Sequence, residues 1–233
     1  MNPTPKPPLH RQVQNQVGHG GRRRGAGRKP KGAVAGVSHS TRARHSHRCP
    51  AHVTVKLRRG LPLLRRPSEY ATLRRAFTKG ADRFGFRLIH YAVLNEHMHF
   101  VVEAKDRRAL TRGLQGLLIR IAKALNKLWR RKGKVFFDRY HDRMLPSPRE
   151  VRTALRYVLH NAKKHAAQGR KVRVPWQVDL FSSAPWFDGF REELHLRGMD
   201  VVIRPTVLAR TWLLRVGWRR HGLIGVNELP ATG

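Results

Sequence analysis

The sequence has few acidic residues and almost no cysteine. Its 233 residues include 14 Asp and Glu against 49 Lys and Arg, which gives a formal net charge of +35. The single cysteine, Cys49, excludes an internal disulfide and a four-cysteine zinc site, and this agrees with a reducing compartment. No apolar run approaches the roughly 20 residues that a membrane-spanning helix needs. With no recognisable secretory leader either, we expect a cytoplasmic or nucleoid-associated protein that has no membrane partner.

The excess of positive charge predicts a polyanionic partner, and nucleic acid fits this role better than a membrane surface. Ribosomal and chromatin proteins are equally basic without being enzymes, so charge predicts a partner and not an activity. The hydrophobic fraction of 40% is sufficient for one core. Much of the chain is therefore expected to fold by itself.

Residues 1 to about 48 are rich in Pro, Gly, Arg and His and have no apolar periodicity. This composition predicts a disordered basic arm, because such a segment buries too little surface to offset the entropy of ordering. The stretches at 21–25 and 27–31, the second of which contains Arg28 and Lys29, are similar to segments that enter a DNA minor groove. A solubilising tail is an equally good interpretation.

Strand and helix patterns alternate from about residue 51. Alternating apolar and polar residues predict a strand over 52–58, and spacings of three and four predict a helix from an N-cap at Ser68 to Phe84. Two apolar runs over 87–94 and 97–102, separated by two residues, predict a β-hairpin. A long amphipathic helix is expected over 106–131, followed by a fourth strand within 134–145.

The last helix of this region has a well-marked start. Ser147 is expected to cap it, Pro148 to occupy the first helical position and Glu150 to complete a capping box, and the apolar face continues to about His165. The predicted order is β-α-β-β-α-β-α. Its simplest packing is an α+β fold, with an antiparallel four-stranded sheet and the helices on one face.

His97 and His99 alternate with apolar residues, so both imidazoles leave the same face of the predicted strand. Imidazoles roughly 7 Å apart along a strand can bind one divalent ion and leave positions open for phosphate oxygens. Two histidines on a solvated face are the alternative, but the tight preceding turn and the apolar opposite face favour a metal site. Glu103 shares this face, either as a group that tunes the metal or as a solvated carboxylate.

Tyrosine is the remaining candidate to attack a phosphodiester, because no serine or cysteine has a recognisable base partner. Tyr157 is distinguished by Asn161, which lies one helical turn later and can offer its amide oxygen as a third metal ligand. Lys164 continues the same row, whereas His160 is expected to turn toward solvent. An amphipathic aromatic at a helix–sheet junction is the alternative interpretation of Tyr157, and Tyr140 is the reserve nucleophile.

Three segments resemble the REP-associated tyrosine transposases, a group of the single-tyrosine HUH transposases. They are 95–99 (NEHMH), 137–143 (FDRYHDR) and 156–161 (RYVLHN), and the resemblance spans about residues 50–190. It implies an HUH, ferredoxin-like palm with the metal pair at His97 and His99, the third ligand at Asn161 and the nucleophile at Tyr157. It also implies Mg²⁺ or Mn²⁺ as the ion, and single-stranded DNA folded into imperfect hairpins as the substrate.

The reaction implied by this resemblance is a transesterification. The tyrosine oxygen attacks a phosphodiester and becomes joined to the 5′ phosphate, and the freed 3′ hydroxyl can later reverse the step. Many relatives have proline where this chain has Ala162, which lets the helix continue, so Tyr157 is expected at a different angle or with less mobility. A hairpin-binding protein that does not cleave is the alternative, and a replication or mobilisation nickase would be expected to carry further domains.

On this basis we divide the chain into the arm (1–48), a catalytic domain (49–180) and a basic, aromatic C-terminal extension (181–233). A helix-like stretch over 205–222 interleaves tryptophans with arginines, and it either stacks bases or packs its tryptophans on the domain. We expect a monomer or homodimer. The predicted DNA-binding cations are Arg28, Lys29, Arg139, Arg143, Lys164, Arg215 and Arg219.

Overall fold

The computed structural model describes residues 45–167, 177–196 and 203–230, and these residues belong to one compact unit. Most of the expected arm, including Arg28 and Lys29, lies outside the described residues. None of the described helices is both long enough and apolar enough to cross a lipid bilayer.

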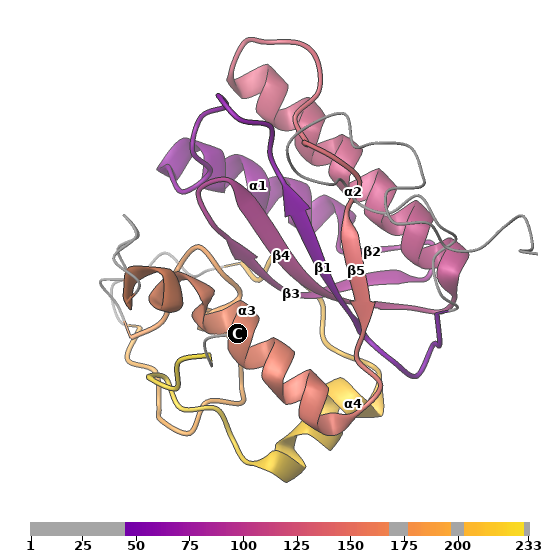
Figure 1. The fold of residues 1–233 in the computed structure, drawn as a ribbon, viewed down its shortest axis with the longest axis vertical. Coiled ribbons are helices and arrows are strands. Elements are labelled where there is room, and N and C mark those ends of the chain that lie inside the picture. Colours follow the sequence, from indigo (N-terminus) through magenta and orange to yellow (C-terminus); the bar gives the residue numbers. More distant parts are fainter. Residues whose placement is uncertain (1–44, 168–176, 197–202, 231–233) are drawn as a thin grey trace, which may run out of the picture. The chain divides into compact units, whose positions relative to one another are not determined.

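A mixed α/β arrangement is built on one antiparallel sheet with the strand order β2-β3-β4-β1-β5 (Figure 1). The strands are β1 (Ala51–Lys56), β2 (Asp82–Arg83), β3 (Phe86–Val93), β4 (His97–Ala104) and β5 (His141–Met144). The predicted hairpin is confirmed as β3 and β4. The prediction of four strands is wrong, because the two-residue β2 is too short to show an alternating pattern.

The fourth predicted strand, within 134–145, is largely irregular. Only β5 at its end pairs with β1, and the earlier part contributes a single bridge between Leu57 and Phe136. The apolar residues at 135–137 therefore predicted a strand where the chain is mostly a loop that runs along the edge of the sheet.

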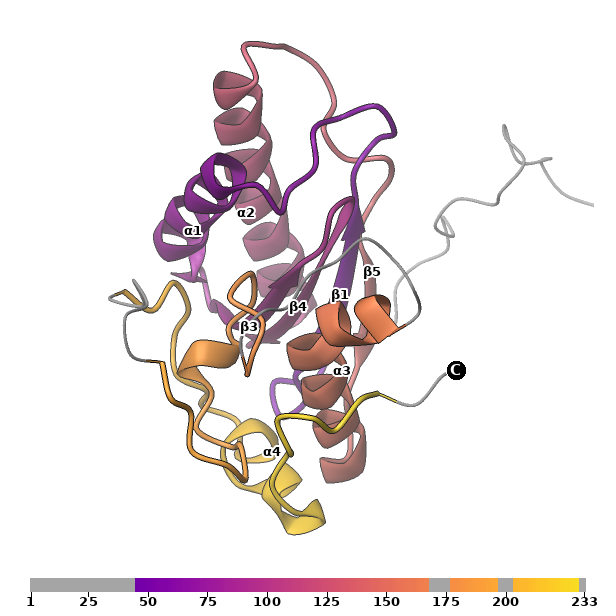
Figure 2. The same cartoon turned by 90° about the vertical axis from the view of Figure 1, so that its left-hand side faces the viewer.

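Helices cover both faces of the sheet, so the prediction that they gather on one face is wrong. Helices α1 (Pro67–Gly80) and α2 (Arg107–Leu128) pack on one face, and α3 (Pro148–Ala167) packs on the other (Figure 2). Alternation along β4 explains the difference. Met98 and Phe100 face α1 and α2, whereas Val101 faces α3 together with Ile89 of β3, so both faces are partly apolar.

Local signals fix the helix starts with one exception. Asp106 caps α2 by accepting a hydrogen bond from the Ala109 amide, and the Ser147 hydroxyl accepts from the Glu150 amide at the start of α3. Helix α1 instead begins after Arg66 with Pro67 in its first turn and no side-chain cap. The predicted cap Ser68 donates to the Glu69 carboxylate, and the helix ends at Gly80, before the expected Phe84.

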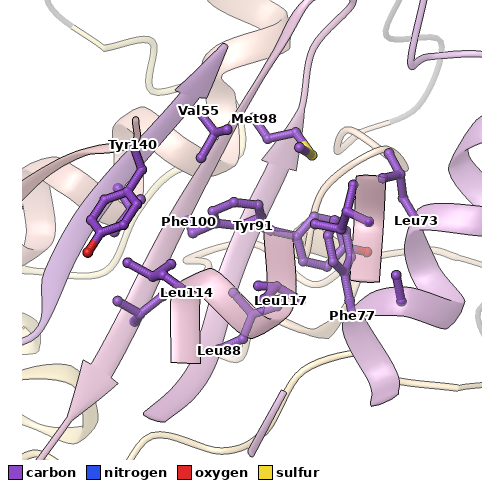
Figure 3. Close-up of a cluster of buried hydrophobic side chains, with 14 of the residues drawn as sticks. Val55, Leu73, Phe77, Leu88, Tyr91, Met98, Phe100, Leu114, Leu117 and Tyr140 are labelled. Carbon is purple, nitrogen blue, oxygen red and sulfur yellow. The ribbon is translucent and has the colours of Figure 1, made fainter. Parts of the chain in front are cut away.

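The core between the sheet and helices α1 and α2 is rich in aromatic rings (Figure 3). Phe77 of α1 meets Tyr91 and Phe100 with ring centroids 4.6 and 5.8 Å away. Gly113 lets α2 approach β3, since a Cβ there would lie 2.1 Å from Phe86 Cβ. Each large side chain buried here contributes roughly 1.5–3 kcal/mol to stability. This core packs α1 and α2 onto the face of the sheet opposite to α3.

A second core joins α3 to the sheet and to the described part of residues 178–226. The expected helix over 205–222 is reduced to the short α4 (Trp212–Arg215) and the 3-10 helix η2 (Gly217–His221), and another 3-10 turn, η1, spans Ala184–Trp186. Trp218 is buried in this core, while Trp212 is 48% exposed. The packing interpretation of the extension therefore holds for Trp218.

Candidate functional site

Strand β4 places His97 and His99 on the face covered by α3, with their ring centroids 5.0 Å apart. His99 is buried, and its Nδ1 lies 3.2 Å from His52 Nε2 and 3.1 Å from Thr54 Oγ1 of the neighbouring β1. Its Nε2 is buried with no hydrogen-bond partner among the described residues. One ring nitrogen of His99 is thus engaged by β1, and the other has no partner in the described part of the chain.

Tyr157 of α3 lies against these histidines. Its ring centroid is 5.1 Å from that of His99, at an interplanar angle of 84°, and 5.7 Å from that of His52. The Lys164 ammonium lies 5.5 Å from the centre of the Tyr157 ring, so the predicted row along α3 is present. Tyr157 thus lies against His99 of the predicted pair and against His52, which was not predicted.

The other three tyrosines lie in the core on the opposite face of the sheet. Tyr70 and Tyr91 share a hydrogen bond of 2.8 Å between their hydroxyls, and Tyr140 belongs to the same hydrophobic cluster. Tyr140 is therefore wrong as the reserve nucleophile. Its ring lies in the cluster to which Leu114 and Leu117 of α2 also belong (Figure 3), whereas α3, which carries Tyr157, belongs to the other core.

Asn161 is fully buried, and neither its amide oxygen nor its amide nitrogen has a partner among the described residues. It lies one turn after Tyr157, which contacts His99, and one turn before His165, whose ring is 5.8 Å from that of His97. Residues four apart share one helix face. Asn161 is thus placed between the two points at which α3 contacts the histidine pair.

One observation indicates that these residues can hold a divalent metal. Two of their buried polar atoms have no hydrogen-bond partner among the described residues. His99 Nε2 and Asn161 Oδ1 are both buried and unpartnered, and a cation would satisfy both. Burial, reinforced by the neighbouring His52 and His97, lowers the pKa of His99 well below its ordinary value and so favours the neutral, ligating imidazole. The described residues contain no group of three His, Cys, Asp or Glu side chains that could hold an ion, so the candidate set needs the asparagine.

A cleft of about 360 Å³ lies beside Tyr157. Its basic residues are Arg143, which is paired with Glu150, and Arg149 near the start of α3. The cleft is lined by His52, Arg143, Leu145, Arg149, Glu150, Thr153, Ala154 and Tyr157. It offers a phosphate-bearing strand a place next to the tyrosine.

The other predicted DNA-binding cations lie in different surroundings. Arg139 and Arg215 are exposed. Arg219 pairs with Asp188 at 3.0 Å and its guanidinium lies 4.8 Å from the centre of the Trp218 ring. Arg219 is thus engaged in holding the extension, whereas Arg143 and Lys164 lie near Tyr157.

His52 and Thr54 were not predicted from the sequence, although a signal for them exists. They alternate with Val53 and Val55 along β1, so both face the α3 side of the sheet. Pairing of β1 with β4 then sets Thr54 directly opposite His99. Alternation along a strand predicts which of its residues share a face, but not which other strand it will pair with.

Two expectations on the α3 side are corrected. His160 is buried against Phe190, with ring centroids 5.7 Å apart, because residues of the C-terminal segment cover the side of α3 that was expected to face solvent. Glu103 is not solvated, and its carboxylate is engaged by the C-terminal segment. It accepts hydrogen bonds from the Arg210 and Thr211 amides and the Thr211 hydroxyl, and it anchors the C-terminal segment to β4.

No family model matches the chain, and no curated protein matches it. Among solved structures, one described as a REP-associated tyrosine transposase bound to a REP hairpin is 22% identical. The alignment covers 55% of this chain and 74% of that one, with a TM-score of 0.45. A likeness of this extent leaves the function to be argued from the residues of this chain.

Proposed function

We propose that this protein cleaves and rejoins single-stranded DNA, with Tyr157 as the nucleophile. The observation that supports it is the contact between α3 and β4, where Tyr157 lies edge-on to His99 and Asn161 offers an unpartnered amide oxygen. The other three tyrosines are packed in the opposite core. A charge of +35 supplies the attraction for a polyanionic substrate.

In the proposed site, His97, His99 and Asn161 hold a divalent ion, Mg²⁺ or Mn²⁺. When bound, such an ion polarises the phosphodiester and stabilises charge on its oxygens. His52 and Thr54 hold His99 Nδ1, which fixes the direction of Nε2. Lys164, whose ammonium lies near the Tyr157 ring, and Arg143 of the adjoining cleft supply positive charge for the phosphate.

The proposed step is a transesterification. The Tyr157 hydroxyl oxygen loses its proton to solvent and attacks phosphorus, the bond from phosphorus to the 3′ oxygen breaks, and the departing 3′ oxygen takes up a proton. One phosphodiester is replaced by another, so the freed 3′ hydroxyl can attack the phosphotyrosine and rejoin the strand. No nucleotide cofactor is required, because the number of phosphoester bonds does not change.

The substrate we propose is a single strand folded into an imperfect hairpin, in line with the motif resemblance of residues 95–99 and 156–161. The test is incubation of a labelled hairpin oligonucleotide with the protein and Mn²⁺, followed by denaturing electrophoresis. We expect a covalent adduct with the wild-type chain and none with Tyr157→Phe. The matched control, Tyr140→Phe, retains the adduct, and an adduct that persists in Tyr157→Phe would refute the assignment.

A hairpin-binding protein without cleavage is the second candidate. The formal net charge of +35 supports it as well as it supports cleavage, because binding alone needs only the attraction for phosphates. It predicts salt-sensitive binding of the same oligonucleotide with no adduct in any divalent metal. The adduct assay therefore separates the two candidates in a single experiment.

A further inference from the structure

The surface between α1 and α2 forms a groove of about 910 Å³ on the side of the sheet away from Tyr157. Its walls carry five cations and its floor is apolar, with Ile119 and Leu128 exposed at 48% and 38%. No carboxylate lines it. The lining residues are Thr72, Arg75, Ala76, Lys79, Gly116, Ile119, Arg120, Lys123, Ala124, Lys127 and Leu128.

The cations of this groove differ from those around α3 because they have no acidic partners. Arg152 and Arg156 of α3 both pair with Glu228 at 2.7 and 3.0 Å. Within the described ranges, by contrast, none of the five groove cations forms an ion pair. The groove therefore concentrates uncompensated charge, beyond what the basic composition alone requires.

One atom in the groove is left without the acceptor it needs. The Nε of Arg120 is buried and has no hydrogen-bond partner among the described residues. A buried guanidinium nitrogen without an acceptor is costly unless a ligand supplies one. An anion seated in the groove would supply it.

A second basic hollow continues the groove at the end of α2. It shares Lys123 and Lys127 and adds Arg130, Arg131 and Lys132. At a rise of about 1.5 Å per residue, Arg120, Lys123 and Lys127 of α2 form a row about 10 Å long. The cations at 130–132 extend this row past the end of the helix. A regular row of this length suits a polymer of phosphates better than a single small anion.

We propose that the α1–α2 groove is a second nucleic-acid site, which binds the phosphate backbone of a DNA duplex. The sheet separates it from Tyr157, so it cannot hold the phosphodiester that the proposed reaction cuts. It binds duplex adjoining the cut strand, or a second DNA molecule, without reading the sequence. An acidic protein helix would also meet cations and an apolar floor, but the cations continue past this floor into the hollow lined by Arg130, Arg131 and Lys132, which favours a longer, uniformly charged ligand.

The test uses the full-length chain and a short blunt-ended DNA duplex that has no single-stranded part. Lys123→Gln combined with Lys127→Gln removes two exposed groove cations. Lys105→Gln combined with Arg108→Gln removes two exposed cations outside the groove and is the matched control. Binding is followed by fluorescence anisotropy at several salt concentrations, and circular dichroism confirms that both variants are folded.

Each lost phosphate contact lowers the slope of log K against log salt by about 0.9 in magnitude. We expect the groove variant to lose about 1.8 of slope and the control variant much less. The site is refuted if the two variants lose the same slope, or if the groove variant binds the duplex as the wild type does. The groove would also be refuted as a nucleic-acid site if the wild type bound an acidic peptide there and the groove variant lost that peptide but kept its duplex binding.

The duplex site is independent of the chemistry at Tyr157, and two variants distinguish the two sites. The Tyr157→Phe variant is expected to bind the duplex with the wild-type slope. The groove variant is expected to form its covalent adduct on a short single strand at the wild-type rate. Loss of adduct in the groove variant would place the groove in the Tyr157 site and overturn the proposal of a second site.

Discussion

At the scale of single residues, the candidate site depends on side chains that hold one another in place. His99 is oriented through Nδ1 by Thr54 and His52, and its ring is enclosed by His52 on one side and Tyr157 on another. Groups that orient a ligand contribute to metal affinity without touching the metal. The consequence is testable without a substrate.

Thr54→Val keeps the shape of the side chain and removes the hydroxyl 3.1 Å from His99 Nδ1. We expect Mn²⁺ affinity to fall about tenfold to a hundredfold, because the imidazole is no longer held in one orientation. Isothermal titration of the DNA-free protein with Mn²⁺ measures this. Tyr157→Phe, which leaves the proposed ligands intact, is expected to bind Mn²⁺ as the wild type does, and an unchanged affinity in Thr54→Val would exclude the orienting role.

Residue patterns predicted four of the six residues gathered here and missed His52 and Thr54 for a physical reason. His97, His99, Tyr157 and Asn161 were found from spacing on one strand and one helix, each a local property of the sequence. His52 enters only because β1 pairs with β4 in the register that sets Thr54 opposite His99. That register is a property of the folded sheet, and no short-range pattern encodes it.

At the scale of elements, the position of α3 decides whether Tyr157 reaches the histidines. Its sheet-facing side packs on Ile89 and Val101, and its opposite side is fastened to the C-terminal segment. Arg152 donates to the Gly222 and Leu223 carbonyls and to the Glu228 carboxylate, which Arg156 also contacts. The helix is thus held from both sides.

The starts of α2 and α3 were predictable, but the end of α1, the short helices of the C-terminal segment and the face that each helix covers were not. Capping residues such as Asp106 and Ser147 act within one turn and are read directly from the sequence. The side of the sheet that α3 covers depends on the apolar residues present on both faces and on a C-terminal segment 70 to 76 residues further along the chain. Contacts such as that between Arg152 and Glu228 leave no local signature.

Glu228→Gln is predicted to loosen α3. Hydrogen bonds to Arg152, together with other contacts, lower the pKa of the Glu228 carboxyl from 4.5 to about 2. Because the folded-state pKa is the lower one, this carboxylate stabilises the fold above about pH 4.5, and the contribution is lost as the pH falls toward 2. At pH 7 we expect the variant to lose about 1–2 kcal/mol of unfolding free energy, from weakened charge-assisted bonds.

Urea denaturation at pH 7, 5 and 3 measures this effect. The wild type is expected to lose stability between pH 5 and pH 3 more steeply than Glu228→Gln, so that the two curves converge in acid. The control is Glu193→Gln, at an exposed glutamate of the C-terminal segment. Its stability should follow that of the wild type at all three pH values. A constant difference between Glu228→Gln and wild type across the three pH values would contradict the linkage.

At the scale of the whole molecule, one sheet separates two cores, and each core positions one basic surface. The core under α1 and α2 supports the duplex groove, and the core around α3 supports the Tyr157 site. The C-terminal segment belongs to the second core, since Phe187, Phe190 and Trp218 pack there with α3. Trp218 therefore acts on the α3 side of the sheet through packing, whereas Trp212 remains half exposed.

Trp218→Ala is expected to cost about 3–5 kcal/mol of unfolding free energy, because it empties a site that is 1% exposed at the centre of the second core. Trp212→Ala, at a ring that is 48% exposed, is expected to cost well under 1 kcal/mol. Thermal and urea denaturation measure both. Because α3 belongs to the same core as Trp218, we expect Trp218→Ala also to lower adduct formation at Tyr157. Binding of duplex in the α1–α2 groove should persist at temperatures at which this variant remains folded. Equal effects of the two substitutions on stability would show that the extension does not carry the core of α3.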